Sequence, residues 1–377
     1  MIYFDHNATS PLCDLGRDAW LEASERFYAN PSSRHRLGQR ADGALEGARE
    51  SLAEALGCSP LDLIWTSGAT ESANAVFIHA FQVLEPEAEV WISQVEHPCV
   101  HEAAERYFKN RVRLIPVTRE GVVDLDWLAD AIKGRRNPGL VAVMAANNVT
   151  GVVQPWEWIR SWCEDRGILF FCDGAQWMGR RSAAGFGGCS FFSGCLHKNG
   201  GPRGIGFLKC PNKGRFYGAI VGGPQLEGRR AGTENLPGAI ALAKVLAHFE
   251  KRIADGETEA RQRHKQAFES GLVAKLPGSV VLGSNVNRLW NSCAVALPNP
   301  NCNGQWTVKL DRAGFAVSAG SACAAGSEKP SDVLTAMGLE GDVVTNVVRI
   351  SAGWETSPHD WKALLQAIET VYAAMAG

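Results

Sequence analysis

Between residues 60 and 210, short apolar runs alternate with segments of helical length and period. The apolar runs predict strands over 63–65, 89–92, 113–117, 140–144, 168–171, 190–192 and 206–208. Helical periodicity lies between several of them, for example over 73–84 and 156–166. Strand–helix alternation with nearly all-apolar strands is typical of a parallel sheet covered on both faces. Ligands of such sheets bind at the carboxyl ends of the strands.

The remainder of the chain has a different pattern. A long helical pattern runs from residue 237 to about 271 and is expected to lead into a second region. That region contains strand-like runs at 279–282 and 346–350 and closes with a helical pattern over 358–374. We therefore expect an α/β protein with a large, mainly parallel sheet and a smaller α+β domain.

Composition and charge exclude several classes of protein. The chain has 377 residues, of which 45% are apolar, and a formal net charge of −2. No run of five like charges occurs, so nucleic-acid binding is not expected. The beginning of the chain lacks the layout of a signal peptide, and no apolar stretch is long enough to cross a membrane. Eleven cysteines without a C-x-x-C pair argue against a zinc site or a disulfide framework, and predict a reducing cytoplasm and no metal.

Polar residues follow two of the predicted strands where apolar core would otherwise continue. Thr66-Ser-Gly-Ala-Thr-Glu71 follows one strand and opens a helix, which suits either an anion site or an ordinary capped helix. Asp173 ends the strand at 168–171 and could pair with the ring nitrogen of pyridoxal phosphate. It could equally cap the next helix.

Three further strand ends carry candidate chemistry. Lys198 follows a strand and precedes a glycine-rich segment, which suits covalent attachment of a carbonyl cofactor or a surface turn. His97 could stack on a cofactor ring and move protons, or could be a loop residue with satisfied hydrogen bonds. The amides of Asn147 and Asn148 could donate to a cofactor oxygen or close a turn.

Cys323 lies in a segment whose other residues are all small, Ser318-Ala-Gly-Ser-Ala-Cys-Ala-Ala-Gly-Ser327. Such a segment has little to pack with, so we predict a mobile loop that carries a reactive thiol. A tight loop around a buried thiol is the alternative, because free cysteines are usually buried.

Taken together and in this order, these segments resemble the cysteine desulfurases of the class V aminotransferase fold, in the group with the longer Ser-Ala-Cys loop. The resemblance covers essentially the whole chain. It is carried by Tyr3-Phe-Asp-His-Asn-Ala-Thr9, Asn30-Pro-Ser-Ser33, Thr66 to Glu71, Glu96-His-Pro98, Asn147-Asn148 with Gly151, Asp173 with Gln176, His197-Lys198, Gly222-Gly-Pro-Gln225, Arg229-Arg-Ala-Gly-Thr-Glu-Asn235, Ser321-Ala-Cys323 and Val348-Arg-Ile-Ser351.

The resemblance implies the type I fold of pyridoxal-phosphate-dependent transferases and a role for each matching residue. Residues 14–255 would form the large cofactor-binding domain, and 1–13 with 256–377 the small domain. Lys198 would attach the cofactor and move protons, and His97 would stack on its ring. The phosphate and ring would be held by the other implied binding residues, which are Ala69, Thr70, Asn148, Asp173, Gln176, Cys195, His197 and, from a partner subunit, Thr233.

The implied reaction removes sulfur from L-cysteine, leaving L-alanine and a persulfide on Cys323 for a sulfur-acceptor protein. Asn148 and Arg349 would hold the substrate, Arg349 through a bidentate contact with its carboxylate. A homodimer with shared sites is implied. The alternatives are a selenocysteine or cystine lyase, an aminotransferase, or a non-catalytic scaffold with the same fold. Iron–sulfur assembly, tRNA thiolation and thio-cofactor synthesis all stay open as destinations of the sulfur.

Three positions depart from the family pattern. Cys195 stands where a phosphate-binding serine is usual, and a thiol is a weak donor, so the cofactor is expected to bind less tightly unless Ser193 substitutes. Val149 stands where an acid is usual. The C-terminal extension that meets an iron–sulfur scaffold protein is not expected here, which puts the usual acceptor in doubt.

Overall fold

The structure, a computed structural model, describes residues 1–134, 136–212, 215–298, 305–320 and 331–376. Its larger sheet has seven strands in the spatial order β2-β8-β7-β6-β5-β3-β4. The strands from β7 through β6, β5 and β3 to β4 are parallel neighbours, whereas β8 is antiparallel to both β7 and β2. Their bounds are β2 Leu63–Thr66, β3 Val90–Ser93, β4 Val112–Ile115, β5 Leu140–Ala142, β6 Leu169–Asp173, β7 Phe191–Cys195 and β8 Gly206–Lys209.

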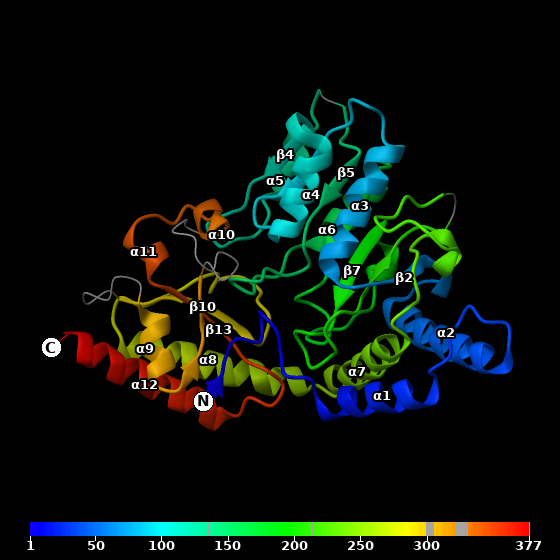
Figure 1. Cartoon of the computed structure of the whole chain (residues 1–377). Coiled ribbons are helices and arrows are strands. Elements are labelled where there is room, and N and C mark those ends of the chain that lie inside the picture. Colours follow the sequence, from blue (N-terminus) through cyan, green and yellow to red (C-terminus); the bar gives the residue numbers. More distant parts are fainter. Residues whose placement is uncertain (135, 213–214, 299–304, 321–330, 377) are drawn as a thin grey trace.

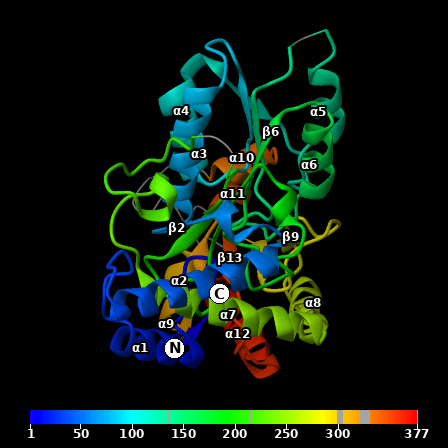
Figure 2. The same cartoon turned by 90° about the vertical axis from the view of Figure 1, so that its right-hand side faces the viewer.

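Helices cover this sheet on both sides. Figure 2 shows α3 (Ala69–Val83) and α4 (Pro98–Phe108) on one side of β6, and α5 (Leu125–Ala131) and α6 (Trp156–Glu164) on the other. Below them, α1 (Asp14–Arg26) and α2 (Arg36–Leu56) pack against α7 (Leu236–Ala254). Every residue of β2, β3, β5 and β7 is buried. The predicted α/β class with a mainly parallel sheet is confirmed.

A second sheet of four strands has the order β12-β13-β10-β9 and is antiparallel throughout. It lies beside α8 (Glu257–Lys275) and α12 (Pro358–Ala376), which pack on each other (Figure 1). The first strand of the chain, β1 (Ile2–Tyr3), pairs with β11 in the same part of the molecule. The remaining bounds are β9 Val280–Val281, β10 Ser292–Ala296, β11 Phe315–Ala316, β12 Ser318–Ala319, β13 Val347–Ser351, α9 Trp306–Arg312, α10 Asp332–Ala336 and α11 Asp342–Thr345.

One predicted element is wrong. The long helix expected from residue 237 to about 271 is two helices, α7 and α8, separated by Asp255 and Gly256. Gly256 has φ 77°, a left-handed conformation that favours glycine and ends an α-helix. The break falls at the predicted domain boundary of 255/256, and that division stays a prediction.

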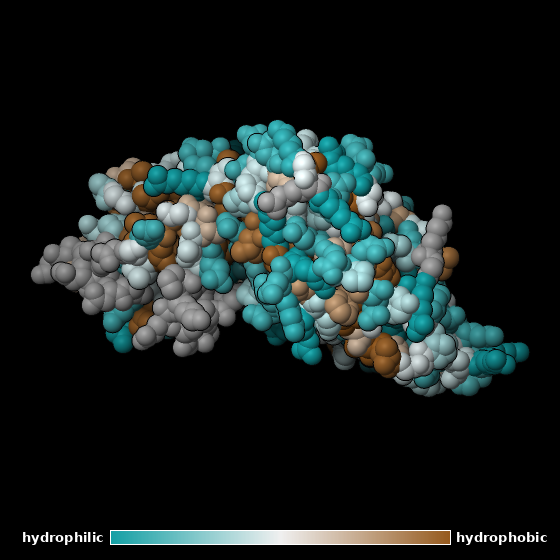
Figure 3. All heavy atoms as spheres, turned by 90° about the horizontal axis from the view of Figure 1, so that it is seen from above, coloured by the Kyte–Doolittle hydropathy of each residue, from teal (hydrophilic) through white to brown (hydrophobic). Residues whose placement is uncertain are grey.

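Within the described part of the chain, no helix is long and apolar enough to cross a bilayer. Seen from above, the described surface is mainly hydrophilic, and its apolar side chains are scattered (Figure 3).

Candidate active site

A cavity of about 570 Å³ lies at the carboxyl ends of the parallel strands. The loops that follow β2, β3, β5, β6 and β7 all contribute to its wall, because parallel strands end at one edge of a sheet. Nearly all predicted site residues in the described ranges line it: Ala69, Thr70, His97, Asn148, Asp173, Gln176, Cys195, His197, Lys198 and Arg349. Residues up to 280 positions apart in sequence, Ala69 and Arg349, therefore meet in one place.

The start of α3 forms one end of the cavity. Gly68 is the N-cap of this helix and has no side chain that could cap the first backbone N–H groups, of which that of Ala69 lies next to the Cys195 sulfur. Ala69, Thr70 and His197 line the cavity here. Burial, with Lys198 and Arg203 nearby, lowers the pKa of His197 to about 4. His197 is therefore neutral at pH 7, and would meet an anion as a hydrogen-bond donor and not as a cation.

Asp173 and Gln176 are held rigidly by neighbouring groups. Asp173 Oδ1 accepts from the Ala175 N–H at 2.9 Å and from the Ser193 hydroxyl at 3.2 Å. Gln176 Oε1 accepts from the guanidinium of the fully buried Arg180. Because arginine only donates, this contact fixes the orientation of the Gln176 amide and leaves Nε2 as the donor.

His97 is the N-cap of α4, where Pro98 starts the helix. Its Nδ1 accepts from the Cys99 N–H at 3.2 Å and lies 3.1 Å from the Cys99 sulfur. A backbone N–H can only donate, so the proton of the neutral ring is on Nε2. Burial, reinforced by Lys198, lowers the pKa of His97. The structure thus places a neutral imidazole with a defined tautomer on the cavity wall.

Cys195 ends β7 and is 2% exposed. Burial raises the pKa of its thiol, which therefore stays protonated. Ser193 does not replace it on the cavity wall, because its hydroxyl is buried and donates to Asp173. The suggested substitution of Ser193 for the usual serine is thus not supported by the geometry.

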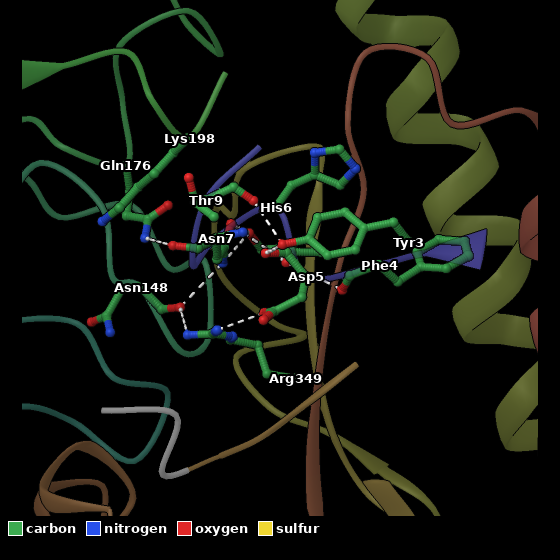
Figure 4. A network of polar contacts seen from close by, with 12 residues as sticks. Tyr3, Phe4, Asp5, His6, Asn7, Thr9, Asn148, Gln176, Lys198 and Arg349 are labelled. Carbon is green, nitrogen blue, oxygen red and sulfur yellow. Dashed lines mark hydrogen bonds and ion pairs between the residues drawn. The ribbon is translucent and has the colours of Figure 1, made fainter. Parts of the chain in front are cut away.

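Asn148 and Arg349 meet at the other end of the cavity, in the network of Figure 4. Gln176 Nε2 donates to the Asn7 carbonyl, and Asn7 Nδ2 donates to the Asn148 carbonyl at 3.1 Å. Arg349 Nη1 donates to the same Asn148 carbonyl, and Arg349 Nη2 pairs with Asp5 at 2.7 Å. Among the described residues, Asn148 Oδ1 and Arg349 Nε are buried without a hydrogen-bond partner. Such groups are costly unless a ligand satisfies them.

Two predicted site residues cannot be placed in this cavity. Cys323 lies outside the described residues. Thr233 is exposed and does not line the cavity, so its predicted role depends on a partner subunit.

Several residues of the cavity wall were not predicted from the sequence. Two of them, Asn7 and Thr9, belong to the segment Tyr3 to Thr9 that carries part of the family resemblance. Asn7 and Thr9 reach the cavity from the beginning of the chain, Cys99 from the first turn of α4, and Arg203 from the loop between β7 and β8. No spacing rule links the beginning of the chain to residues 148 or 349, so only the folded chain reveals these contacts.

The donor set fits pyridoxal phosphate. A helix start without a side-chain cap suits a phosphate, and a buried carboxylate suits a protonated ring nitrogen. Lys198 lines the same cavity and its carbonyl is fixed by the Ser10 hydroxyl at 2.7 Å. The unpartnered atoms of Asn148 and Arg349 suit an amino-acid substrate. Fold and site together define the class of pyridoxal-phosphate-dependent enzymes.

Comparison with known proteins identifies the family to which the chain belongs within this class. The family model described as aminotransferase class-V matches residues 2–364. A protein named cysteine desulfurase 2, from Trichormus variabilis, is 33% identical and is aligned over 98% of this chain and 93% of its own. A cysteine desulfurase from a Nostoc species is 35% identical over 93% of this chain and 88% of its own. This chain therefore belongs to the class V aminotransferase family, among the cysteine desulfurases, as the sequence resemblance predicts.

Solved structures agree with this assignment. A NifS-like protein superposes with a TM-score of 0.89 over 99% of both chains, at 27% identity. A structure titled SspA in complex with cysteine superposes with a TM-score of 0.80 at 28% identity, covering 93% of this chain and 98% of that one.

Proposed function

We propose that this protein removes sulfur from L-cysteine with pyridoxal phosphate, and that Cys323 takes up the sulfur. The observation that carries the proposal is the cavity in which Lys198, Asp173, Gln176 and His97 meet the unpartnered atoms of Asn148 and Arg349. The aligned relatives are named cysteine desulfurases, which supports L-cysteine as the substrate.

The chain offers a defined group for each part of the cofactor. Lys198 would hold it covalently, Asp173 would pair with its ring nitrogen, and Gln176 Nε2 would donate to its ring oxygen. The start of α3 and His197 would hold its phosphate. When bound, pyridoxal phosphate supplies an electron sink for bond breaking next to the substrate α-carbon.

The protein's own residues would orient the substrate and move protons. Arg349 would hold the carboxylate, and Asn148 Oδ1 would accept from the substrate amino group. Lys198 would take the α-proton, and His97, neutral and protonated on Nε2, would assist proton transfer.

The sulfur transfer itself balances without another reactant. The Cys323 thiolate would attack the substrate sulfur, so that one S–S bond forms while the substrate C–S bond breaks. The electron pair of the C–S bond goes to the carbon. Of the two thiol protons, one ends on that carbon, which becomes the methyl group of the product, and the other belongs to the persulfide. L-Cysteine and one protein thiol thus give L-alanine and one protein persulfide.

We also propose a homodimer in which Thr233 completes the phosphate site of the partner subunit. Its exposure and the exposed side chains of Ile220 and Val221 on the same segment support this arrangement. The acceptor is proposed to be a protein of unknown identity. The nine described cysteines are all free, which supports a reducing compartment such as the cytoplasm.

Turnover of L-cysteine tests the proposal. Wild-type protein loaded with pyridoxal phosphate is expected to release L-alanine and, with a reductant, sulfide. Cys323→Ala is expected to retain the absorbance of the bound cofactor and to lose sulfide release, whereas Cys58→Ala, a half-buried cysteine remote from the cavity, keeps full activity.

Normal sulfide release by Cys323→Ala would refute the role of this thiol and favour a selenocysteine or cystine lyase. Turnover on selenocysteine and cystine measures that alternative directly. Formation of a keto acid from an amino acid would indicate an aminotransferase instead, and absence of cofactor absorbance would revive the non-catalytic scaffold.

A further inference from the structure

The buried guanidinium of Arg349 already has a carboxylate partner in the absence of substrate. Its side chain is 2% exposed, and Nη2 lies 2.7 Å from Asp5 Oδ1. The Asp5 side chain is 20% exposed. A counter-charge offsets part of the cost of burying an arginine, and here Asp5 supplies it from a segment 344 positions away.

Main-chain contacts fix this pair. Asp5 forms a parallel bridge with Ser351, two residues beyond Arg349 on β13. The Ser351 N–H donates to the Phe4 carbonyl at 2.7 Å, and the His6 N–H donates to the Ser351 carbonyl at 3.2 Å. The pair is therefore held by two aligned backbones, unlike an ion pair between flexible surface side chains.

One nitrogen of the Arg349 guanidinium group has no hydrogen-bond partner among the described residues. Nη2 contacts Asp5 and Nη1 contacts the Asn148 carbonyl, whereas Nε is buried without a described partner. Asn148 Oδ1 is also unpartnered, and both residues line the cavity. A carboxylate ligand at Arg349 would thus share the guanidinium with the Asp5 carboxylate (Figure 4).

We propose that Asp5 is a positioning residue that sets the affinity of the site for amino-acid carboxylates. The inference rests on the proposed role of Arg349 in holding the substrate. Asp5 keeps the guanidinium in place and cancels most of its charge, so a second carboxylate binds to a nearly neutral pair and not to a free cation. The physical consequence is weaker binding of both the substrate and the product, which favours release of L-alanine.

The test is the substitution Asp5→Asn, which keeps the hydrogen-bond acceptor and removes the charge. The inhibition constant of L-alanine is expected to fall about tenfold, because one opposing charge next to the bound carboxylate is gone. The KM for L-cysteine is also expected to fall, while kcat does not rise. A merely structural role predicts the opposite, since a loosened Arg349 would bind carboxylates less tightly.

A matched control exists on the surface. Asp14 pairs with Arg17 at 2.8 Å, both largely exposed, and Asp14→Asn makes the same chemical change outside this cavity. It is expected to leave the inhibition constant of L-alanine unchanged. Asp5→Ser serves as a second, smaller neutral variant, and each variant is checked by its melting temperature and its cofactor absorbance.

The outcomes separate the two proposals. If Arg349→Gln leaves the KM for L-cysteine and the inhibition constant of L-alanine unchanged, the proposed carboxylate site itself is wrong. If Arg349→Gln raises both, but the neutral Asp5 variants leave the L-alanine constant unchanged or raise it, only the role of Asp5 is overturned.

Discussion

Replacing one sulfur atom with oxygen should strengthen cofactor binding. Cys195 lies on the cavity wall at the end of β7, close to the start of α3, where the phosphate is proposed to bind. Burial raises the pKa of its thiol, so the group presents a neutral and weak donor. Cys195→Ser puts a hydroxyl of nearly the same size at this position, with no other change in the wall.

The expected gain follows from the chemistry of the ligand. A hydrogen bond from a hydroxyl to a charged group contributes about 1.5–3 kcal/mol in proteins. Because the weak thiol contact is lost in exchange, we expect the lower end, about 1.5 kcal/mol, which is about tenfold in affinity. The dissociation constant of pyridoxal phosphate is measured by titrating cofactor-free protein and following absorbance.

A control variant and a refuting outcome make the measurement decisive. Cys58→Ser introduces the same atom change away from the cavity and should leave cofactor affinity unchanged. Unchanged or weaker cofactor binding by Cys195→Ser would show that this position does not face the phosphate, and the reasoning from the family pattern would fail.

Two further predictions concern stability. Burial lowers the pKa of Lys265 to about 8 from 10.5 in the unfolded chain, so between these values the unfolded state binds more protons. The free energy of unfolding of the wild type, relative to Lys265→Met, should rise by up to about 3 kcal/mol from pH 8 to pH 10.5, and parallel pH curves would contradict this. Phe4 is fully buried with its ring 4.9 Å from that of Trp361, so Phe4→Ala should cost about 3–5 kcal/mol in urea unfolding, and a loss below about 1 kcal/mol would contradict it.

The large sheet was predictable because its strands carry local signals. Strands buried on both faces read as continuous apolar runs, and seven such runs predicted the seven strands of the sheet. The direction of β8 was not predictable, since an apolar run does not encode its orientation. The break between α7 and α8 carried a signal in Asp255-Gly256, a turn dipeptide, but the helical period continues on both sides and obscured it.

The helices near the beginning of the chain were missed for a different reason. The buried face of α2 carries Leu45, Leu52 and Leu56 among smaller residues, so an apolar stripe of helical period was present but lay outside the segment of strand–helix alternation from which the helices were predicted. Strand β10 was also missed, although all five of its residues are buried, because two of the five are alanines, which have a low strand propensity. In the structure, α2 packs against α7, and β10 pairs with β13.

The two ends of the cavity differ in how far sequence alone could reach them. The cofactor end is built from consecutive strand ends of one sheet, so a single topological rule brings Asp173, Cys195 and Lys198 together. The substrate end depends on Asp5 and Arg349, which meet only because the beginning of the chain pairs with β13. A polar residue on a short pairing strand has no distinctive spacing or period. The same cofactor end can therefore serve many reactions, while the contacts proposed to select the substrate belong to the part of the fold that only tertiary pairing creates. The proposed role of Asp5 therefore could not be predicted from the sequence. Because the two ends are built separately, substitutions at Asp5 and Arg349 should change substrate affinity while cofactor binding stays intact.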